Sequence, residues 1–226
     1  MRQQTRAATL HKGEFQRLIK ITRATAKLPE RAVLVLMLGH KAGLRITEIS
    51  RITVADVMFP SGKLREEVSL RAAVTKGCRP RSAFIVHKQL VAALEAYLQF
   101  RLARGIGTGQ GGVKYRGLLP HQPVIYSARG APMQQNTKRR LLDSGQVKHF
   151  KACDSLQSHV TKLYKLAGIV GGSSHSGRRT FAGRVLAATG DFDKVALLLG
   201  HTSIDVSQRY IDVREDTLRA MFADAV

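Results

Sequence analysis

One segment of the sequence, residues 30–42, is almost entirely apolar. Its densest run, residues 32–38, has seven consecutive apolar residues, whereas a helix that spans a membrane needs about 20. A helix that is apolar on all sides is stable in water only when other parts of the protein cover it. The segment therefore predicts a central core helix, and Gly43 directly after it is a typical C-terminal stop.

The apolar residues elsewhere predict mainly helices, with one β-hairpin. Phe15, Leu18 and Ile19 recur at helical spacing and predict a first helix that ends near residue 26, after which Pro29 opens the core helix. Residues 67–87 change to a β pattern and predict an antiparallel hairpin with a basic tip at 76–80. Further helices are predicted from Thr47 and at residues 90–98, 156–167, 175–188, 192–199, 204–210 and 216–222. The order predicts an α+β fold that is mainly α, in a single domain over residues 1–226.

The charge of the chain is strongly positive. It has 37 Lys and Arg residues against 16 Asp and Glu, a formal net charge of +21. Solubility alone needs a net charge of only about 2–8 in a small domain. Dense Lys and Arg residues bind polyanions by neutralising phosphates and releasing counterions. We therefore expect nucleic acid as the partner, with an anionic membrane surface as the second choice.

The cysteines and the N-terminus indicate the compartment. Cys78 and Cys153 are the only cysteines and lie 75 positions apart, a spacing that provides neither a disulfide framework nor a CxxC metal site. Residues 1–15 contain basic groups without a following apolar stretch, so they do not resemble a secretory signal. We expect a cytoplasmic protein without a membrane partner.

Residues 105–154 form a glycine-rich and then basic segment, which we expect to be flexible or inserted. Residues 107–112 match GxGxxG literally, but they follow a predicted helix instead of a strand, which argues against a dinucleotide site. The sequence also lacks an HExxH motif, a closely spaced Asp pair that resembles a two-metal nuclease site, and a GxxxxGK[ST] motif. Metal and cofactor sites are therefore not predicted, and any phosphate chemistry must use cations and a protein nucleophile.

Arg178 lies at the edge of an apolar helix stripe. His175 and Arg178 are three residues apart, so a helix places them on one face. An uncompensated guanidinium at such a position is costly, and either a bound anion or a buried carboxylate of the protein meets this need. The neighbouring Arg179 should point elsewhere, toward solvent or a DNA backbone.

Arg45 presents the same question, because it follows the core helix and Gly43-Leu44 instead of lying on a charged face. Glu48, three residues later, can pair with it or hold it in place. Taken singly, Lys76 reads as a solvated turn residue, His201 as a helix-start histidine and Tyr210 as a core tyrosine. None of these residues alone indicates a function.

Together these residues resemble the tyrosine recombinase (phage integrase) family. Residues 42–49, AGLRITEI, resemble its first arginine box, and residues 175–182, HSGRRTFA, match its His-x-x-Arg helix. Residues 199–204, LGHTSI, match its Leu-Gly-His segment, with Tyr210 nine residues after His201. Thr75-Lys76-Gly77 with Arg81 is similar to its catalytic hairpin. The four elements occur in the family order over residues 42–211.

The resemblance implies the helical catalytic-domain fold of this family and an active site of six residues, Arg45, Lys76, His175, Arg178, His201 and Tyr210. It implies that Tyr210 attacks DNA and forms a 3′-phosphotyrosyl intermediate. The two arginines would neutralise charge at phosphorus, with Glu48 in support. The residues expected to contact the DNA backbone are Arg79, Arg81, Lys138, Arg139, Arg140 and Arg179.

The expected function is site-specific strand cleavage and rejoining of double-stranded DNA. Only about forty residues precede Arg45, so we expect a catalytic domain without the separate N-terminal DNA-binding domain of most relatives. Self-association on DNA is expected, with the apolar stripe Leu218, Met221 and Phe222 as a candidate contact. Two alternatives are a DNA-binding accessory protein without turnover and a type IB topoisomerase.

Overall fold

The structure is a computed structural model that describes residues 7–70, 81–109, 112–141 and 145–200. The predicted helices at 204–210 and 216–222 lie outside these residues. In chain order, the described elements are α1 (Lys12–Thr25), α2 (Pro29–Ala42), α3 (Ile46–Ile49), α4 (Val54–Val57), β1 (Glu67–Leu70), β2 (Arg81–Phe84), α5 (Lys88–Ala103), the 3-10 helix η1 (Lys114–Gly117), β3 (Asn136–Leu141), β4 (Val147–Ala152), α6 (Asp154–Leu166), α7 (Ser176–Thr189) and α8 (Phe192–Leu199). The predicted mainly α class with small antiparallel sheets is confirmed.

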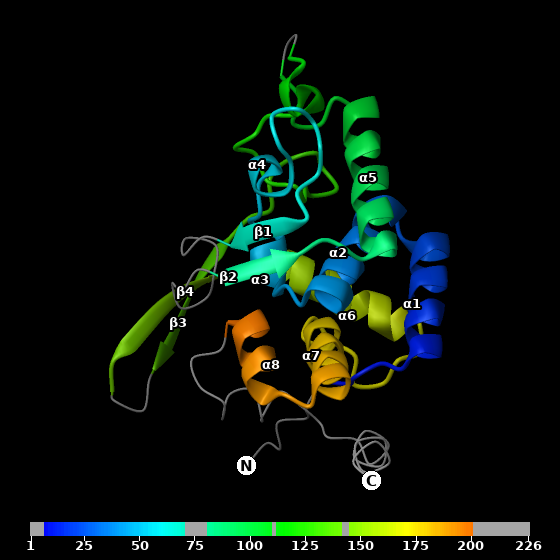
Figure 1. Ribbon diagram of the computed structural model, residues 1–226, viewed down its shortest axis with the longest axis vertical. Coiled ribbons are helices and arrows are strands. Elements are labelled where there is room, and N and C mark those ends of the chain that lie inside the picture. The colour runs from blue at the N-terminus through cyan, green and yellow to red at the C-terminus, as the bar shows by residue number, and fades with distance from the viewer. Residues whose placement is uncertain (1–6, 71–80, 110–111, 142–144, 201–226) are drawn as a thin grey trace.

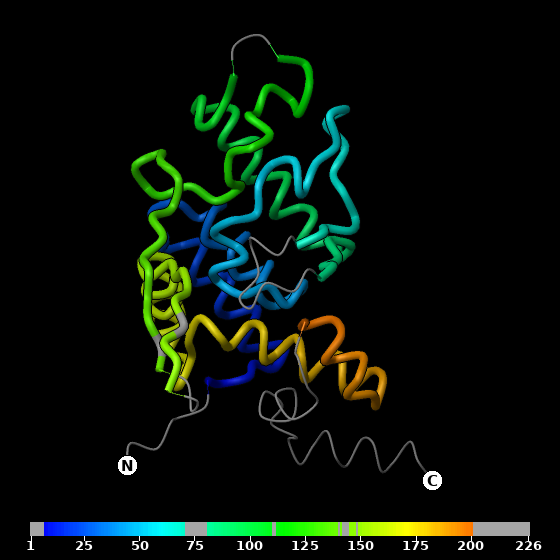
Figure 2. Tube along the Cα trace, turned by 90° about the vertical axis from the view of Figure 1, so that its left-hand side faces the viewer, coloured from blue at the N-terminus to red at the C-terminus, as the bar shows by residue number. Residues whose placement is uncertain are grey.

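The apolar segment forms α2, which lies at the centre of the molecule with α1, α5, α6 and α7 packed against it (Figures 1 and 2). All residues from 31 to 40 are buried, as the all-round apolar pattern predicts. Pro29 occupies the first turn, and Gly43 ends the helix in the left-handed conformation with φ 63°. A Cβ at Gly43 would lie 2.6 Å from the ring of Phe181. Glycine therefore allows both the turn and the close approach of α7.

The helix α1 begins with a capping box. His11 Nδ1 accepts the backbone N–H of Glu14 at 3.2 Å, and Glu14 Oε2 accepts the backbone N–H of His11 at 3.0 Å. The predicted apolar residues Phe15 and Leu18 are buried against the core. Burying this stripe positions the N-terminus of α1 beside α7, where Leu10 N donates to Thr180 Oγ1 at 3.0 Å.

The predicted basic hairpin is present as β1 and β2. The strands pair antiparallel from Glu67↔Phe84 to Leu70↔Arg81. The second strand begins two residues earlier than the apolar run 83–86 predicts, because Arg81 already pairs with Leu70. The predicted tip, residues 76–80, lies outside the described residues.

The irregular part of 105–154 is shorter than predicted, because residues 136–152 contain a second antiparallel hairpin, β3–β4. Its strands carry no alternating apolar pattern, and the apolar Leu141 and Val147 are 68% and 53% exposed. Because this hairpin does not bury one face against the core, its sequence has no alternation of apolar and polar residues from which the strands could be predicted. The hairpin extends away from the helices in Figure 1.

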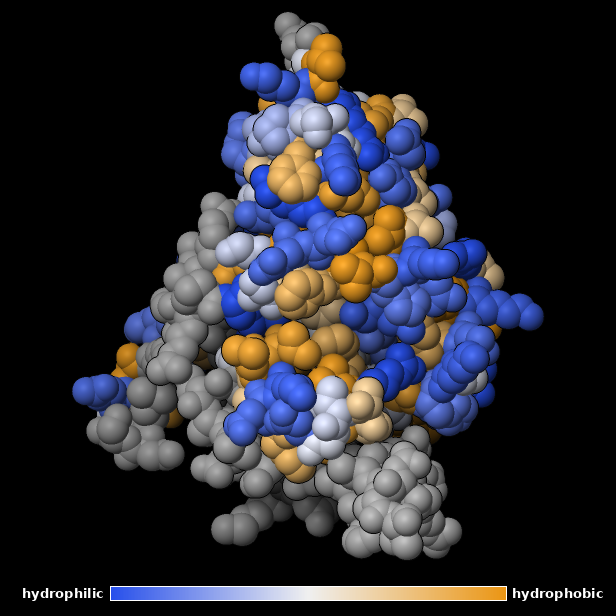
Figure 3. All heavy atoms as spheres, in the orientation of Figure 1, coloured by the Kyte–Doolittle hydropathy of each residue, from blue (hydrophilic) through white to orange (hydrophobic). Residues whose placement is uncertain are grey.

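The surface in Figure 3 is largely hydrophilic, with apolar residues gathered in the centre of this face, around β2 and α8. Among the described residues, no helix is both long and apolar enough to cross a membrane.

Candidate active site

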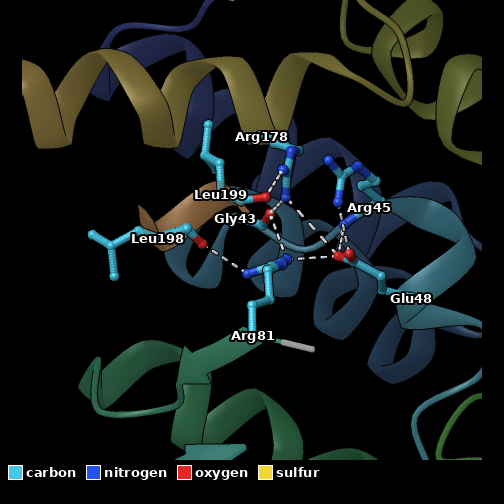
Figure 4. A network of polar contacts seen from close by, with 7 residues as sticks. All are labelled: Gly43, Arg45, Glu48, Arg81, Arg178, Leu198 and Leu199. Carbon is cyan, nitrogen blue, oxygen red and sulfur yellow. Dashed lines mark hydrogen bonds and ion pairs between the residues drawn. The ribbon is translucent and has the colours of Figure 1, made fainter. Parts of the chain in front are cut away.

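Arg45 is fixed by the turn that ends α2. It is the N-cap residue of α3, and its backbone N–H donates to Glu48 Oε2 at 2.7 Å. Its guanidinium Nη1 also donates to Glu48 Oε1 at 2.9 Å, and its side chain is 18% exposed. Glu48 therefore holds both the backbone and the side chain of Arg45, and the predicted supporting contact is present (Figure 4).

Arg178 lies on α7 with its guanidinium directed at the same carboxylate. Its side chain is 1% exposed, and Nη1 lies 3.9 Å from Glu48 Oε2. Nη1 donates to the carbonyl oxygen of Gly43 at 2.5 Å, and Nη2 donates to the carbonyl oxygen of Leu199. Arg178 thus joins the end of α2 to the end of α8 (Figure 4). The buried carboxylate that its position required is Glu48.

Arg81, which was expected to contact the DNA backbone, is buried in this cluster. The side chain is 4% exposed, and Nη2 donates to Glu48 Oε2 at 2.6 Å. Nη1 donates to the carbonyl oxygen of Leu198 at 2.8 Å. The alternation of Arg81, Ala83 and Ile85, all buried, places the arginine on the inner face of the strand. The same alternation was readable in the sequence.

The cluster of Arg45, Arg81, Arg178 and Glu48 is an electropositive site. Three guanidinium groups against one carboxylate leave an excess of two positive charges. Burial alone would raise the pKa of Glu48, but the fields of Arg81, Arg178 and Arg45 and the hydrogen bond from Arg81 outweigh it and hold the pKa below its ordinary value. Glu48 is therefore ionised at neutral pH. The excess charge and the planar guanidinium groups suit a phosphodiester anion.

His175 and Arg179 flank Arg178 at the start of α7. His175 is the N-cap residue of α7 and is exposed. Arg179 was expected to point toward solvent or a DNA backbone, but it is 5% exposed, so the prediction of a solvent-facing side chain is wrong. Residues 176–180, the first turn of α7, are all buried. On the side that faces α2, a Cβ at Gly177 would lie 3.0 Å from the backbone of Gly39.

The remaining predicted residues divide into three groups. Lys138 on β3 is 47% exposed and lies 2.7 Å from Asp154 Oδ1, and Arg139 beside it is exposed. Arg140 pairs through its backbone with Lys148 in the hairpin. Four predicted residues lie outside the described part of the chain, namely Lys76, Arg79, His201 and Tyr210.

The end of α8 is tied to the arginine cluster. Gly200 ends the helix with φ 60°, and a Cβ there would lie 2.6 Å from Arg81 Cδ. Arg81 and Arg178 bind the carbonyl oxygens of Leu198 and Leu199, the last two residues of the helix. Both arginines therefore fix the point from which the chain continues to His201.

Comparison with known proteins agrees with this geometry. The model of the phage integrase family matches residues 8–217. The chain belongs to the phage integrase family. Related members include the tyrosine recombinase XerC of Pelobacter propionicus, 25% identical over 198 residues, which cover 88% of this chain and 52% of that protein. XerC of Agrobacterium fabrum is 30% identical over 218 residues, covering 90% and 54%. This integrase-family chain thus spans about half the length of such relatives.

Solved structures of the family share the fold. The XerA recombinase superposes with a TM-score of 0.68 at 22% identity, covering 96% of this chain and 65% of XerA. The XerH site-specific recombinase, bound to its palindromic difH substrate, gives a TM-score of 0.62 at 17% identity, covering 97% and 53%. The predicted tyrosine recombinase catalytic-domain fold is confirmed.

Proposed function

We propose that this chain is a site-specific DNA recombinase that cleaves and rejoins strands through a 3′-phosphotyrosyl intermediate. The observation that carries the proposal is the convergence of Arg45 and Arg178 on Glu48. These arginines come from the two motifs that the integrase family places around a phosphate, and they are 133 positions apart in the sequence.

The arginines stabilise charge that develops on the scissile phosphate. Glu48 and the carbonyl oxygens of Gly43 and Leu199 hold the two guanidinium groups before DNA arrives. Groups that are fixed in advance need no reorganisation as the phosphorus becomes pentacoordinate, so their charge lowers the barrier. Removing one such donor from an enzyme typically costs about 10²–10³ in rate.

The chemical steps follow from the motif residues. Tyr210 Oη attacks phosphorus, a new O–P bond forms, and the bond from phosphorus to the 5′ oxygen breaks. His175 accepts the phenol proton, because a phenol with an ordinary pKa near 10 needs help to ionise. Lys76 protonates the departing 5′ oxygen, and His201 donates a hydrogen bond to the phosphate. Attack by a 5′-hydroxyl on the phosphotyrosine reverses these steps and rejoins a strand.

The proposed partners are duplex DNA and further copies of the chain. XerH is solved with difH DNA, and a lambda integrase(75–356) is solved as a dimer bound to a core site. The net charge of +21 favours a polyanionic partner for this chain as well. Recombination joins two sites, so it requires at least two protomers on DNA.

The decisive experiment is covalent capture of DNA by the Tyr210→Phe variant. The wild-type protein should form a denaturant-resistant adduct on a nicked or suicide duplex, and the variant should form none while its DNA affinity changes little, because only the nucleophilic oxygen is lost. Tyr115→Phe is the matched control and should retain capture.

Other results would support different conclusions about the nucleophile or the function. An adduct with Tyr210→Phe would refute the assigned nucleophile. Absence of any adduct with the wild-type protein, together with retained DNA binding, would favour the accessory-protein alternative. Relaxation of a supercoiled plasmid that lacks any recombination site would favour a type IB topoisomerase.

A further inference from the structure

A second electropositive site lies away from the arginine cluster, in a cavity of about 750 Å³ between the start of α1, the end of α2, the start of α5 and α7. Figure 1 shows α1 and α5 on the side of the molecule away from β3–β4. Among the described residues, the lining carries the cations Lys12, Lys41 and Arg184 together with His11 and His87, and no carboxylate. None of the four residues of the arginine cluster lines it.

The positive groups of this cavity lack a counter-charge among the described residues. Neither Lys41 nor Arg184 makes a hydrogen bond or an ion pair with any residue that the structure describes. Lys41 Nζ lies 5.5 Å from the centre of the Phe15 ring, a cation–π distance. The nearest acid on α1, Glu14, is engaged with His11, whose Nε2 lies 3.5 Å from Glu14 Oε2.

The cations of this cavity also repel one another. Burial and then the field of Arg184 lower the pKa of Lys41, and burial lowers the pKa of Arg184 itself. Burial and the fields of Lys41 and Arg184 lower the pKa of His87. Gathering such groups without a carboxylate costs stability, and a bound anion would recover that cost.

Two helix N-termini add to the positive field. The N-cap residues of α1 and α5, His11 and His87, both line the cavity. An α-helix carries a partial positive charge at its N-terminus, which favours anions. The Nδ1 atom of His87 accepts the backbone N–H of Gln89 at 3.2 Å. A neutral His87 therefore carries its proton on Nε2 and offers a donor.

We infer that this cavity, lined by Lys41, Arg184, His87 and Lys12, is a phosphate-binding site distinct from the arginine cluster. A phosphate group suits it because its charge and several oxygens match clustered cations and N–H donors. The phosphate belongs either to a DNA backbone outside the cleavage point or to a free phosphorylated solute. The inference stands independently of the proposed recombinase chemistry, because it uses none of the residues assigned to cleavage.

The test measures binding of inorganic pyrophosphate to the full chain by isothermal titration calorimetry. The double variant Lys41→Met and Arg184→Met removes both charges but keeps apolar side chains of similar length. We expect it to bind pyrophosphate at least about tenfold more weakly, since two charge-assisted contacts are lost. In buffer without phosphate its melting temperature should equal or exceed that of the wild type, because an uncompensated repulsion is gone.

Matched controls make the result specific. The variant Lys162→Met and Lys165→Met removes two exposed cations from α6 and should bind pyrophosphate like the wild type. Arg184→Gln repeats the measurement with a polar side chain, so that a folding defect of the double variant does not decide the outcome. Equal pyrophosphate affinity in the cavity variants and the wild type would overturn the inference.

A second measurement identifies the source of the phosphate. If it is a DNA phosphate, the double cavity variant should reduce the slope of log affinity for duplex DNA against log salt by about 1–2, one unit for each lost contact. If it is a free solute, the slope should remain that of the wild type while pyrophosphate binding is lost. Covalent capture by Tyr210 is scored separately, so failure of either proposal leaves the other testable.

Discussion

Glu48 is a fully buried carboxylate that accepts the backbone N–H of Arg45 and is surrounded by three guanidinium groups. It lies 2.9 Å from Arg45, 2.6 Å from Arg81 and 3.9 Å from Arg178. Removing one partner of a buried charge group costs about 3–5 kcal/mol, because the remaining charges stay desolvated. We expect Glu48→Gln to lower the free energy of unfolding by about this amount, as measured by urea denaturation. A loss below about 1 kcal/mol would mean that the arginines do not depend on this carboxylate.

The same carboxylate gives stability a defined pH dependence. Because the pKa of Glu48 is below its ordinary value of 4.5 in the folded protein, its contribution is complete above that value. The contribution is lost as pH falls below 4.5 and through the folded pKa. The difference in unfolding free energy between wild type and Glu48→Gln should therefore shrink below about pH 4.5. A constant difference down to pH 2.5 would contradict an ionised Glu48.

Arg178 has a structural role and a proposed chemical role, and one substitution can separate the two. Arg178→Lys keeps a positive charge, but an ammonium lacks the planar fork that binds Gly43 and Leu199 together. Single-turnover DNA cleavage should fall by about 10²–10³, whereas DNA affinity should change by less than about tenfold. Equal losses in cleavage and affinity would make Arg178 a binding residue only.

Sequence reasoning located single residues where a motif or a charge constrained them. Arg45 and Arg178 were predicted to share one active site because of the resemblance to the tyrosine recombinase family, and Glu48 was predicted to pair with Arg45 or hold it in place. Arg81 and Arg179 were predicted as DNA contacts, and both are buried. The burial of Arg179 depends on the packing of other parts of the chain around α7. Such packing is a tertiary property that helix periodicity does not show.

At the scale of elements, β3–β4 has two unequal faces. Lys138 and Asn136 share one face, and both contact Asp154 at the start of α6. Arg139 and His149 pair directly across the strands on the other face, and both are exposed. The first face anchors the hairpin to the body of the protein. The second face is available to a DNA backbone.

This asymmetry predicts different effects for neighbouring cations. Arg139→Ala should weaken DNA binding and reduce the salt slope by about 1, because one phosphate contact is lost. Lys138→Ala should change the slope less, since its ammonium already has Asp154 as a partner. Filter binding or fluorescence anisotropy across a salt series measures both variants. Equal slopes for the two variants would contradict the assignment of the faces.

Helices and strands could be predicted from the sequence where a buried face gives the apolar residues a regular spacing. The helices α1, α2, α6, α7 and α8 agree with their predicted ranges within about two residues, because each covers the core with an apolar stripe or surface. The β3–β4 hairpin was missed because its residues are largely polar and lie outside the core. Residues 118–126 are held in place by hydrogen bonds instead of an apolar stripe. The guanidinium of Arg101 donates to the carbonyl oxygens of Pro123 and Val124. Hydrogen bonds of this kind produce no periodic pattern in the sequence.

At the scale of the whole molecule, three guanidinium groups gather around one carboxylate and leave an excess of positive charge. Both oxygens of Glu48 accept hydrogen bonds from arginines, so this carboxylate is already engaged within the protein. Among the described residues, no three His, Cys, Asp or Glu side chains gather as a metal site would require. Because Glu48 holds Arg45 and lies beside Arg178, we expect their guanidinium groups to supply the charge that opposes the developing negative phosphate.

This arrangement predicts that DNA cleavage does not depend on divalent ions. Single-turnover cleavage by the full chain in EDTA should proceed within about twofold of the rate with magnesium, because the guanidinium charges are fixed by protein contacts and remain when metal is withdrawn. Ionic strength must be matched between the two reactions, since binding by a chain of net charge +21 is itself sensitive to salt. A rate that collapses in EDTA at matched ionic strength and saturating DNA would refute the guanidinium mechanism. A loss that disappears when DNA is raised to saturation would instead locate the effect in binding.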